Sequence, residues 1–425
     1  MASQRVYILG GYQTDFAKNW SRKEETLFDM LKESVEGGLS AAKIDPAEID
    51  VAHVGNFVAE LFTGQGQLGG LFNAIHPAFA SLPSARHEAA CASGSMATLA
   101  ATAEIEAGRY DLACVSGIEL MRNVDGQKGA EYLGAAMWVG EEAQDANFPW
   151  PYQFSEIADL YAERYGLEQS HLARIAHINF SNAKRNPNSQ TRQWVFTEDS
   201  FADNDEANPV IEGRLRKQDC GQITDGAATV FLASKEYAAD YATKHGIDLN
   251  DIPHIQGWGH RTAPMKLETK KEIGRDHKYM FPHVRQTITD AYQRAGISGP
   301  DELDGIETHD CFTISEYVAI DNFGITEPGE AWKAIETGTI ELEGKLPINA
   351  SGGLIGCGHP VGATGVRMLL DGYKQTAGQA GDYQIEGAKR VATLNIGGSL
   401  TTVASFVVGT GDGGGRTPAK VTLPW

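Results

Sequence analysis

Short, almost wholly apolar runs separated by longer helical stretches limit what this chain can fold into. The runs lie at residues 6–9, 51–54, 112–116, 229–233, 305–308, 391–394 and 401–408. Runs without polar alternation are typical of strands buried on both faces between layers of helices. Helical spacing of apolar residues lies between them, at 27–42, 95–107, 156–165, 284–295 and 364–376. The alternation predicts an α/β layered fold.

The two halves of the chain look loosely alike, because each has a strand-helix-strand core with a small-residue helix after a key motif. The stretch from about 120 to 220 differs: it is polar and rich in short helices. We expect residues 1–120 and 221–275 to form the N-terminal half, 121–220 an inserted loop domain, and 276–425 the C-terminal half. An insertion of this kind either covers a site or packs in an oligomer.

The charge balance excludes several classes of partner. The chain has 36 Lys and Arg against 56 Asp and Glu, a net charge of −20. Phosphate backbones are repelled, so nucleic acid is not expected. There is no run of 18 apolar residues for membrane insertion, and the N-terminus looks like a first strand rather than a leader, so we expect a cytoplasmic protein. A basic cluster at Arg214, Arg216 and Lys217 is either an anion site or a solvated turn.

The five cysteines are far apart and form no C-x-x-C pair, which argues against a zinc ribbon within the chain. Cys91 lies in the motif EAACASGS (88–95), directly before an expected helix. The free amides and partial positive charge of a helix N-terminus stabilise a thiolate and should lower its pKa. A buried, inert cysteine is the competing interpretation.

Three further motifs carry candidate groups. His359 is held between glycines and a proline in GCGHPVGATG (356–365), a frame that aims an imidazole at one point. THDCFT (308–313) follows a strand, and adjacent residues there point to opposite faces, so they are poor metal co-ligands. Gly397 and Gly398 form either a tight turn or an oxyanion hole.

Taken together, the cysteine and histidine motifs in this order resemble the thiolase superfamily, over nearly the whole chain from residue 6 to 408. Lesser matches are GGYQTDF (10–16) and DCGQITDGAA (219–228). The HDCF run at 309–312 resembles sterol-carrier-protein-type thiolases. The resemblance implies two similar βαβαβαββ halves in an α-β-α-β-α arrangement. The familiar thiolases carry a second catalytic cysteine where this chain has Asn395.

The resemblance also implies roles for individual residues. His359 takes the proton of Cys91, which then carries the acyl group, and Cys311 acts as acid and base at the α-carbon, with Cys357 as the alternative. The amides of Cys91 and Gly397 form one oxyanion hole. A second lies between His309 and His359, whereas Asp310 is structural. Coenzyme A and acyl-CoA thioesters are substrates, and neither a permanently bound cofactor nor a metal is expected.

The resemblance implies a homodimer or tetramer. Three alternatives stay open. The first is another Claisen-condensing enzyme of the same fold, although the HDCF motif argues against it. The second is a subunit that works only with a small OB-fold, zinc-ribbon protein, and the third is a non-catalytic binder of CoA esters. Acyl-chain length and reaction direction are not encoded in any motif.

Overall fold

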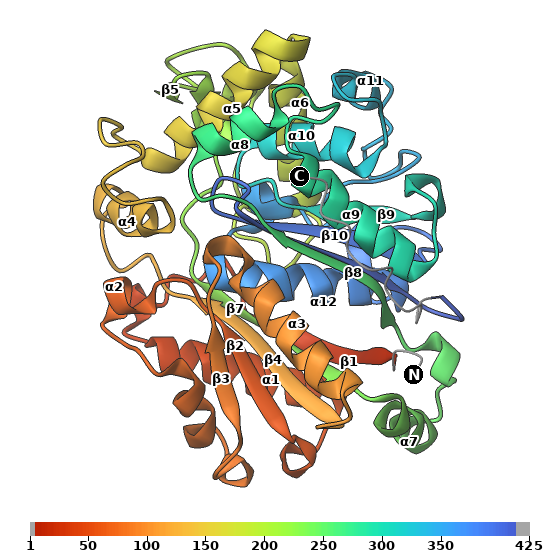
Figure 1. The fold of residues 1–425 in the computed structure, drawn as a ribbon. Helices are drawn as coiled ribbons and strands as arrows, with labels where there is room; N and C mark the ends of the chain where they lie inside the picture. Colours follow the sequence, from red (N-terminus) through yellow and green to blue (C-terminus); the bar gives the residue numbers. More distant parts are fainter. Residues whose placement is uncertain (1–4, 414–425) are drawn as a thin grey trace.

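The computed structural model describes residues 5–413 and confirms the α/β layered fold. Nine strands form a mixed sheet in the order β3-β2-β4-β7-β1-β8-β11-β10-β9 (Figure 1). The strands are β1 (Val6–Gln13), β2 (Val51–Gly55), β3 (Ser84–His87), β4 (Leu112–Glu119), β7 (Gly226–Ala233), β8 (His254–Thr262), β9 (Gly305–Thr308), β10 (Arg390–Gly397) and β11 (Thr402–Gly409). A separate hairpin joins β5 (Val210–Glu212) to β6 (Leu215–Arg216).

The nine strands form two half-sheets joined at one corner. The β1 and β8 strands pair through only two residue pairs, Val6 with Ile255 and Tyr7 with His254. Five strands, β3, β2, β4, β7 and β1, form the N-terminal half-sheet, and four, β8, β11, β10 and β9, form the C-terminal half-sheet. In the C-terminal half, the place next to β9 that corresponds to β3 holds a single bridge between Ile306 and Ile348. The two halves therefore repeat one topology, with the fifth strand reduced in the second copy.

In the described part of the chain, twelve α-helices surround and separate these half-sheets. They are α1 (Leu27–Ala42), α2 (Ala59–Thr63), α3 (Ser93–Glu106), α4 (Gly126–Leu133), α5 (Pro149–Tyr165), α6 (Gln169–Ala183), α7 (Lys235–His245), α8 (Leu267–Gly274), α9 (Pro282–Ala295), α10 (Thr313–Phe323), α11 (Ala331–Glu336) and α12 (Thr364–Thr376). Among residues 5–413, no helix combines the length and apolar character needed to cross a membrane.

The layers follow from which helices share a core with which strands. The α1 and α7 helices pack on the outer face of the N-terminal half-sheet. The α3 and α12 helices form one core with strands of both halves, so they lie between the half-sheets (Figure 1). The α9 and α10 helices cover the outer face of the C-terminal half-sheet. This gives the predicted α-β-α-β-α order.

Local signals explain several of the boundaries. The Thr26 side chain accepts from the Asp29 amide and the Asp29 side chain accepts from the Thr26 amide, a capping box that starts α1. Glycines in the left-handed conformation end α7, α9 and α10. The α1 and α12 helices have the predicted bounds, whereas α3 begins at Ser93, two residues earlier than predicted. Residues 121–220 contain α4, α5, α6 and the β5–β6 hairpin; the proposed domain division stays a prediction.

A buried charge network ties α12 to β9. The Arg367 side chain is fully buried; it bonds to the carboxylates of Glu307 and Asp371 at 3.0 and 2.8 Å, and to the Ser351 hydroxyl at 2.7 Å. A buried charged group costs free energy in a low-dielectric interior unless its oppositely charged partners are present. The network therefore fixes how the central helix meets the C-terminal half-sheet.

Removal of this arginine should strongly destabilise the fold. Arg367→Ala leaves two buried carboxylates without their cation, and we expect it to lower the free energy of unfolding by about 3–5 kcal/mol. Lys345→Ala is the matched control, because Lys345 pairs with Asp301 at 2.8 Å on the exposed surface. The control should lose less than about 1 kcal/mol. Urea unfolding at one protein concentration measures both, and equal losses would contradict the role of the network.

Candidate active site

A cavity of about 420 Å³ lies where four motifs meet. The groups that form its reactive end are Cys91, His309, Cys311, His359 and Gly398. Cys91 comes from the turn before α3, and His309 and Cys311 come from the loop between β9 and α10. His359 comes from the loop before α12, and Gly398 from the turn after β10. The tertiary structure thus brings all of the predicted motifs to one place.

Cys91 lies in a single 3-10 turn, Ala90–Ala92, that leads into α3. Ala90 has φ +50°, a conformation that strains a residue with a Cβ. The Ser93 hydroxyl holds the turn, because it accepts from the Ala89 amide at 2.9 Å and donates to the Ala90 carbonyl at 2.6 Å. Gly397 packs against this turn, and a Cβ there would collide with the Ala89 carbonyl. The glycine is thus needed for close approach of β10.

The predicted lowering of the Cys91 pKa is wrong. Burial raises the pKa of the thiol to about 12, although a hydrogen bond from the Gly398 amide acts in the opposite direction. Desolvation outweighs the helix N-terminus, because apolar surroundings disfavour any charged form. Cys91 therefore rests as a neutral thiol near pH 7, and its ionisation requires a neighbouring base.

His359 has the geometry of that base. Its Nδ1 lies 2.7 Å from the Thr364 hydroxyl, which itself donates to the Pro360 carbonyl at 3.1 Å. Because the hydroxyl proton is committed to Pro360, Nδ1 of His359 carries a proton and Nε2 keeps a lone pair. Burial lowers the pKa of His359 to about 3. The imidazole is therefore neutral near pH 7 and able to accept a proton.

His309 has the opposite tautomer. The side-chain amide of Asn395 lies 3.1 Å from His309 Nδ1 and 3.1 Å from the Cys91 carbonyl, and its oxygen accepts from the Ser95 hydroxyl at 2.7 Å. The Cys91 carbonyl can only accept, so the Asn395 nitrogen faces it and also donates to Nδ1. His309 then carries its proton on Nε2. Burial, and next the neighbouring His359, lower its pKa well below the usual range.

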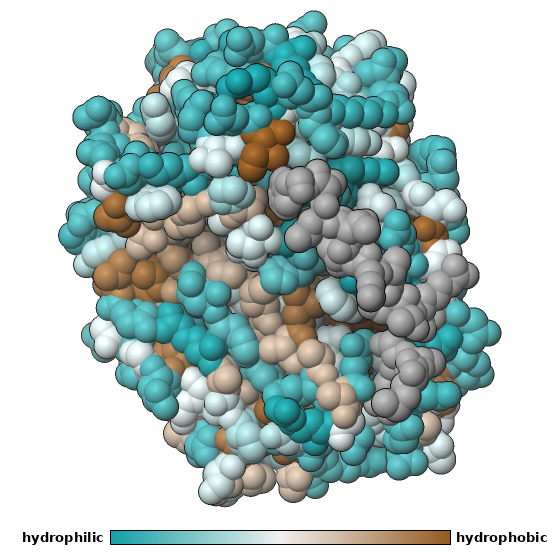
Figure 2. Space-filling view, viewed as in Figure 1, coloured by the Kyte–Doolittle hydropathy of each residue, from teal (hydrophilic) through white to brown (hydrophobic). Residues whose placement is uncertain are grey.

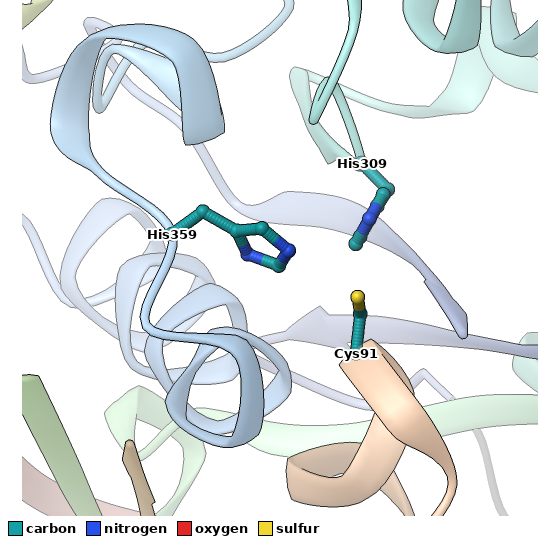
Figure 3. A group of neighbouring side chains, drawn as sticks. All are labelled: Cys91, His309 and His359. Atoms are coloured by element: carbon teal, nitrogen blue, oxygen red, sulfur yellow. The ribbon is translucent and has the colours of Figure 1, made fainter. Parts of the chain in front are cut away.

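Cys91, His309 and His359 converge, with one potential ligand atom of each within 4.8 Å of the others (Figure 3). The two imidazole rings are perpendicular, with centroids 5.1 Å apart. A soft metal ion binds Cys and His ligands, but a ligating nitrogen must offer a lone pair. On His309 the Asn395 amide occupies the lone pair of Nδ1. The set therefore provides a thiol, an acceptor and a donor rather than three metal ligands.

Cys311 and Cys357, the two candidates for the acid and base at the α-carbon, differ in their positions relative to the cavity. Cys311 lines the cavity, and its sulfur lies 3.7 Å from the Ser315 hydroxyl. Burial raises the pKa of Cys311 well above its usual value. Cys357 is fully buried and does not line the cavity; its sulfur accepts from the Gln13 and Asn186 side chains at 3.6 Å each. Of these two cysteines, only Cys311 faces the cavity.

Asp310 supports the loop that precedes His359. Its carboxylate accepts from the Leu354 amide at 2.5 Å and from the Asn179 side chain at 2.8 Å. These contacts hold the π-helical turn Gly353–Cys357, in which a Cβ on Gly353 would collide with Asp310. A single π turn of this kind is often found next to a functional site. Asp310 points away from the cavity, as the strand alternation predicts.

Sequence reasoning missed the groups that hold the glycine turn. The Lys270 ammonium, which is buried on α8, donates to the Ser399 and Thr401 hydroxyls at 3.0 and 2.8 Å. The His283 imidazole lies 2.7 Å from the Leu400 carbonyl, where Leu400 has φ +60°. Burial lowers the pKa of Lys270 to about 7. No motif marks these residues, because their role depends on the packing of α8 and α9 against the turn.

The basic cluster is divided by the structure. Arg214 pairs with Asp159, and Arg216 pairs with Asp203 and with Asp205. Lys217 is exposed and lines the cavity. Two members of the cluster are therefore neutralised by carboxylates, and one is available at the cavity.

The fold and the convergent thiol and imidazoles define a thiolase-like protein. Residues 6–236 match the family model for the thiolase N-terminal domain, and residues 266–410 match the thiolase C-terminal domain-like model. The chain belongs to the thiolase family.

Relatives and solved structures agree with this. An acetyl-CoA acetyltransferase of Methanothermobacter thermautotrophicus is 32% identical to this chain, and the alignment covers 95% of this chain and 98% of the relative's length. Human sterol carrier protein 2 is 26% identical to this chain, and the alignment covers 96% of this chain and 72% of the relative's length. A solved structure named Ltp2-ChsH2(DUF35) aldolase aligns with a TM-score of 0.72 at 18% identity, covering 96% of this chain and 98% of that one. This last similarity shows the fold alone.

The raised pKa of Cys91 predicts its reactivity with alkylating agents. The thiolate fraction grows about tenfold per pH unit below the pKa, so labelling of Cys91 by iodoacetamide should still rise about tenfold per unit from pH 7.5 to 9.5. Peptide mapping by mass spectrometry follows Cys91 separately from the other cysteines, and Cys91→Ala identifies its peptide. A labelling rate that has already reached its plateau at pH 8 and does not rise further would show that the Cys91 thiol is ionised at neutral pH.

The tautomer of His309 should depend on Asn395. Asn395→Asp replaces the donating amide by a second acceptor, so we expect the proton of His309 to move to Nδ1. Nitrogen-15 chemical shifts of histidine-labelled protein report which ring nitrogen is protonated. Ser95→Ala is the control, because it leaves the Asn395 amide in place and should keep the Nε2 proton. An unchanged His309 signal in Asn395→Asp would overturn the assignment.

Proposed function

We propose that this protein is a thiolase that makes or cleaves the carbon–carbon bond of a 3-oxoacyl-CoA through an acyl group on Cys91. Family membership and relatives named acetyl-CoA acetyltransferases support an acyltransferase. The observation that carries the proposal is the convergence of Cys91, His309 and His359 with complementary tautomers. A nucleophile, its base and a hydrogen-bond donor are the parts that acyl transfer needs.

The first half-reaction transfers an acyl group to the enzyme. The Cys91 thiol gives its proton to Nε2 of His359 while its sulfur bonds to the thioester carbon. The amides of Cys91 and Gly397 stabilise the oxyanion, and the neighbouring Gly398 amide already bonds to the sulfur. The carbon–sulfur bond to coenzyme A then breaks, and the departing thiolate takes the proton from His359. The products are acyl-Cys91 and free coenzyme A.

The second half-reaction forms the new bond. The Cys311 thiol first gives its proton to Nε2 of His359, and the resulting thiolate, a strong base because it is buried, removes a proton from the α-carbon of a second thioester. The Nε2 protons of His309 and His359 stabilise the enolate oxygen. The α-carbon attacks acyl-Cys91, and the sulfur of Cys91 leaves and takes the proton from His359, while Cys311 keeps the α-proton as its thiol. In reverse, free coenzyme A cleaves a 3-oxoacyl-CoA.

Cys311 distinguishes this proposal from its rivals. A condensing enzyme with a Cys-His-His set does not need a thiol facing the α-carbon, whereas Cys311 lines the cavity. A non-catalytic binder would not need a nucleophile with its own base. Coenzyme A and its esters are the substrates in this proposal, with no resident cofactor, and Lys217 at the cavity suits their negative charge.

Assembly is part of the proposal. The β3 strand ends the sheet, so its outer edge is suited to pair with a second copy in a homodimer or tetramer. A second candidate is a subunit that acts only with a small OB-fold or zinc-ribbon protein. It is supported by one structural neighbour whose name joins Ltp2 to ChsH2, a DUF35 component, and by a relative named as a subunit of benzoylsuccinyl-CoA thiolase.

Acylation and α-proton exchange test the roles separately. Acyl-CoA should place a thioester on Cys91 that free coenzyme A removes, and Cys91→Ala should carry none. Cys311→Ala should keep acylation but lose exchange of the acetyl-CoA α-protons in D2O by about 10²–10⁴-fold. Cys357→Ala is the matched control and should keep both.

Mass spectrometry follows the adduct and NMR the exchange. Loss of exchange in Cys357→Ala instead of Cys311→Ala would reverse the assignment of the second base. Absence of an adduct with the isolated chain, restored by a DUF35-type partner, would favour the second candidate.

A further inference from the structure

The active-site cavity continues from the reactive groups into a chamber of aromatic side chains. We propose that this chamber binds a bulky apolar acyl group, either aryl or at least six carbons long, in preference to acetyl. The inference rests on the proposed function, because it concerns the group that Cys91 would carry. It goes beyond that function by naming the substrate class.

One wall of the chamber comes from α5 and the residue after Cys311. The Phe154 and Phe312 rings stack with centroids 4.6 Å apart and 28° between their planes. Phe148 and Trp150 lie at the start of α5 and extend the same wall, with Ile211 of β5 beside them. Because Phe312 follows Cys311 directly, this aromatic wall begins next to the proposed α-carbon base.

Further lining comes from the N-terminal half, from α4 and from the turn after α4. Its side chains are those of Phe57, Met121, Ala130, Leu133 and Ala136. In the space-filling view a band of hydrophobic surface crosses the middle of the face that carries α4 (Figure 2). Apart from the reactive end, most of the side chains that line the cavity are therefore aromatic or aliphatic.

Polar groups are scarce in this chamber. Apart from the histidines of the reactive end, the lining residues with polar side chains are Lys217 and Gln222. The Gln222 amide donates to the Cys220 carbonyl at 3.3 Å, which reduces what it can offer a ligand. A polar acyl group would lose its hydrogen bonds to water without replacement there, whereas a hydrocarbon loses none. The chemistry of the walls therefore selects an apolar group.

The size of the cavity favours an acyl group larger than acetyl. An apolar cavity of about 150 Å³ is large enough to hold benzene, and this cavity measures about 420 Å³. The coenzyme A arm of a thioester takes part of this volume, and an acetyl group on Cys91 would still leave the aromatic side chains of the lining facing water. A longer chain or a ring would cover those walls and gain the free energy of burying them.

Competition between acyl donors tests the proposal. The rate of Cys91 acylation, followed by intact-protein mass spectrometry, is measured with acetyl-CoA, octanoyl-CoA and phenylacetyl-CoA. We expect at least one of the two larger donors to react about tenfold or more faster than acetyl-CoA at equal concentration. Acetyl-CoA reacting as fast as both would overturn the inference but leave the thiolase function intact. Absence of any adduct would overturn the proposed function itself.

A variant that fills the chamber gives an independent test. Ala130 is on α4 and lines the cavity, so Ala130→Phe should reduce acylation by the preferred larger donor about tenfold more than it reduces acylation by acetyl-CoA. Ala135→Phe is the matched control, because Ala135 is exposed and does not line the cavity. It should change neither rate. Equal losses for both donors in Ala130→Phe would overturn the placement of the acyl group.

Discussion

The hydrogen bonds of Asn395 place the nucleophile and the imidazole donor relative to each other. Asn395 is on β10 of the C-terminal half, yet its oxygen accepts from Ser95 at the start of α3, some 300 residues earlier in the chain. Its amide donates both to the Cys91 carbonyl and to His309. Gly365 of α12 makes room for this contact, since a Cβ there would collide with Ser95 and Asn395. One side chain thus connects three catalytic segments across the two halves.

This connection has a chemical consequence because the site excludes charge. Burial keeps both imidazoles neutral, so their tautomers decide what each can do. Asn395 makes His309 a donor, and Thr364 makes His359 an acceptor. In a neutral, preorganised site, fixed hydrogen-bond donors in a low-dielectric cavity stabilise the charge that develops on the reacting oxygen. Asn395 therefore positions Cys91 and His309 relative to each other.

Secondary structure was predictable where local signals are strong. The α1 helix has a capping box and α12 follows a proline and glycine frame, and both have the predicted bounds. The β3 and β8 strands were not predicted: β3 is a short edge strand with mixed burial, and β8 ends in polar residues. The thiol pKa was predicted with the wrong sign, because the sequence displays the helix start but not the burial that outweighs it.

The sequence by itself determined which chemical groups are available and their local frames: a cysteine before a helix, a histidine between glycines, and a His-Asp-Cys-Phe run at a strand end. Each frame depends on a few neighbouring residues. Only the tertiary structure decided that these groups converge, that Cys311 rather than Cys357 faces the cavity, and which tautomer each histidine adopts. Those outcomes depend on contacts between residues tens to hundreds of positions apart, and no local pattern encodes such contacts.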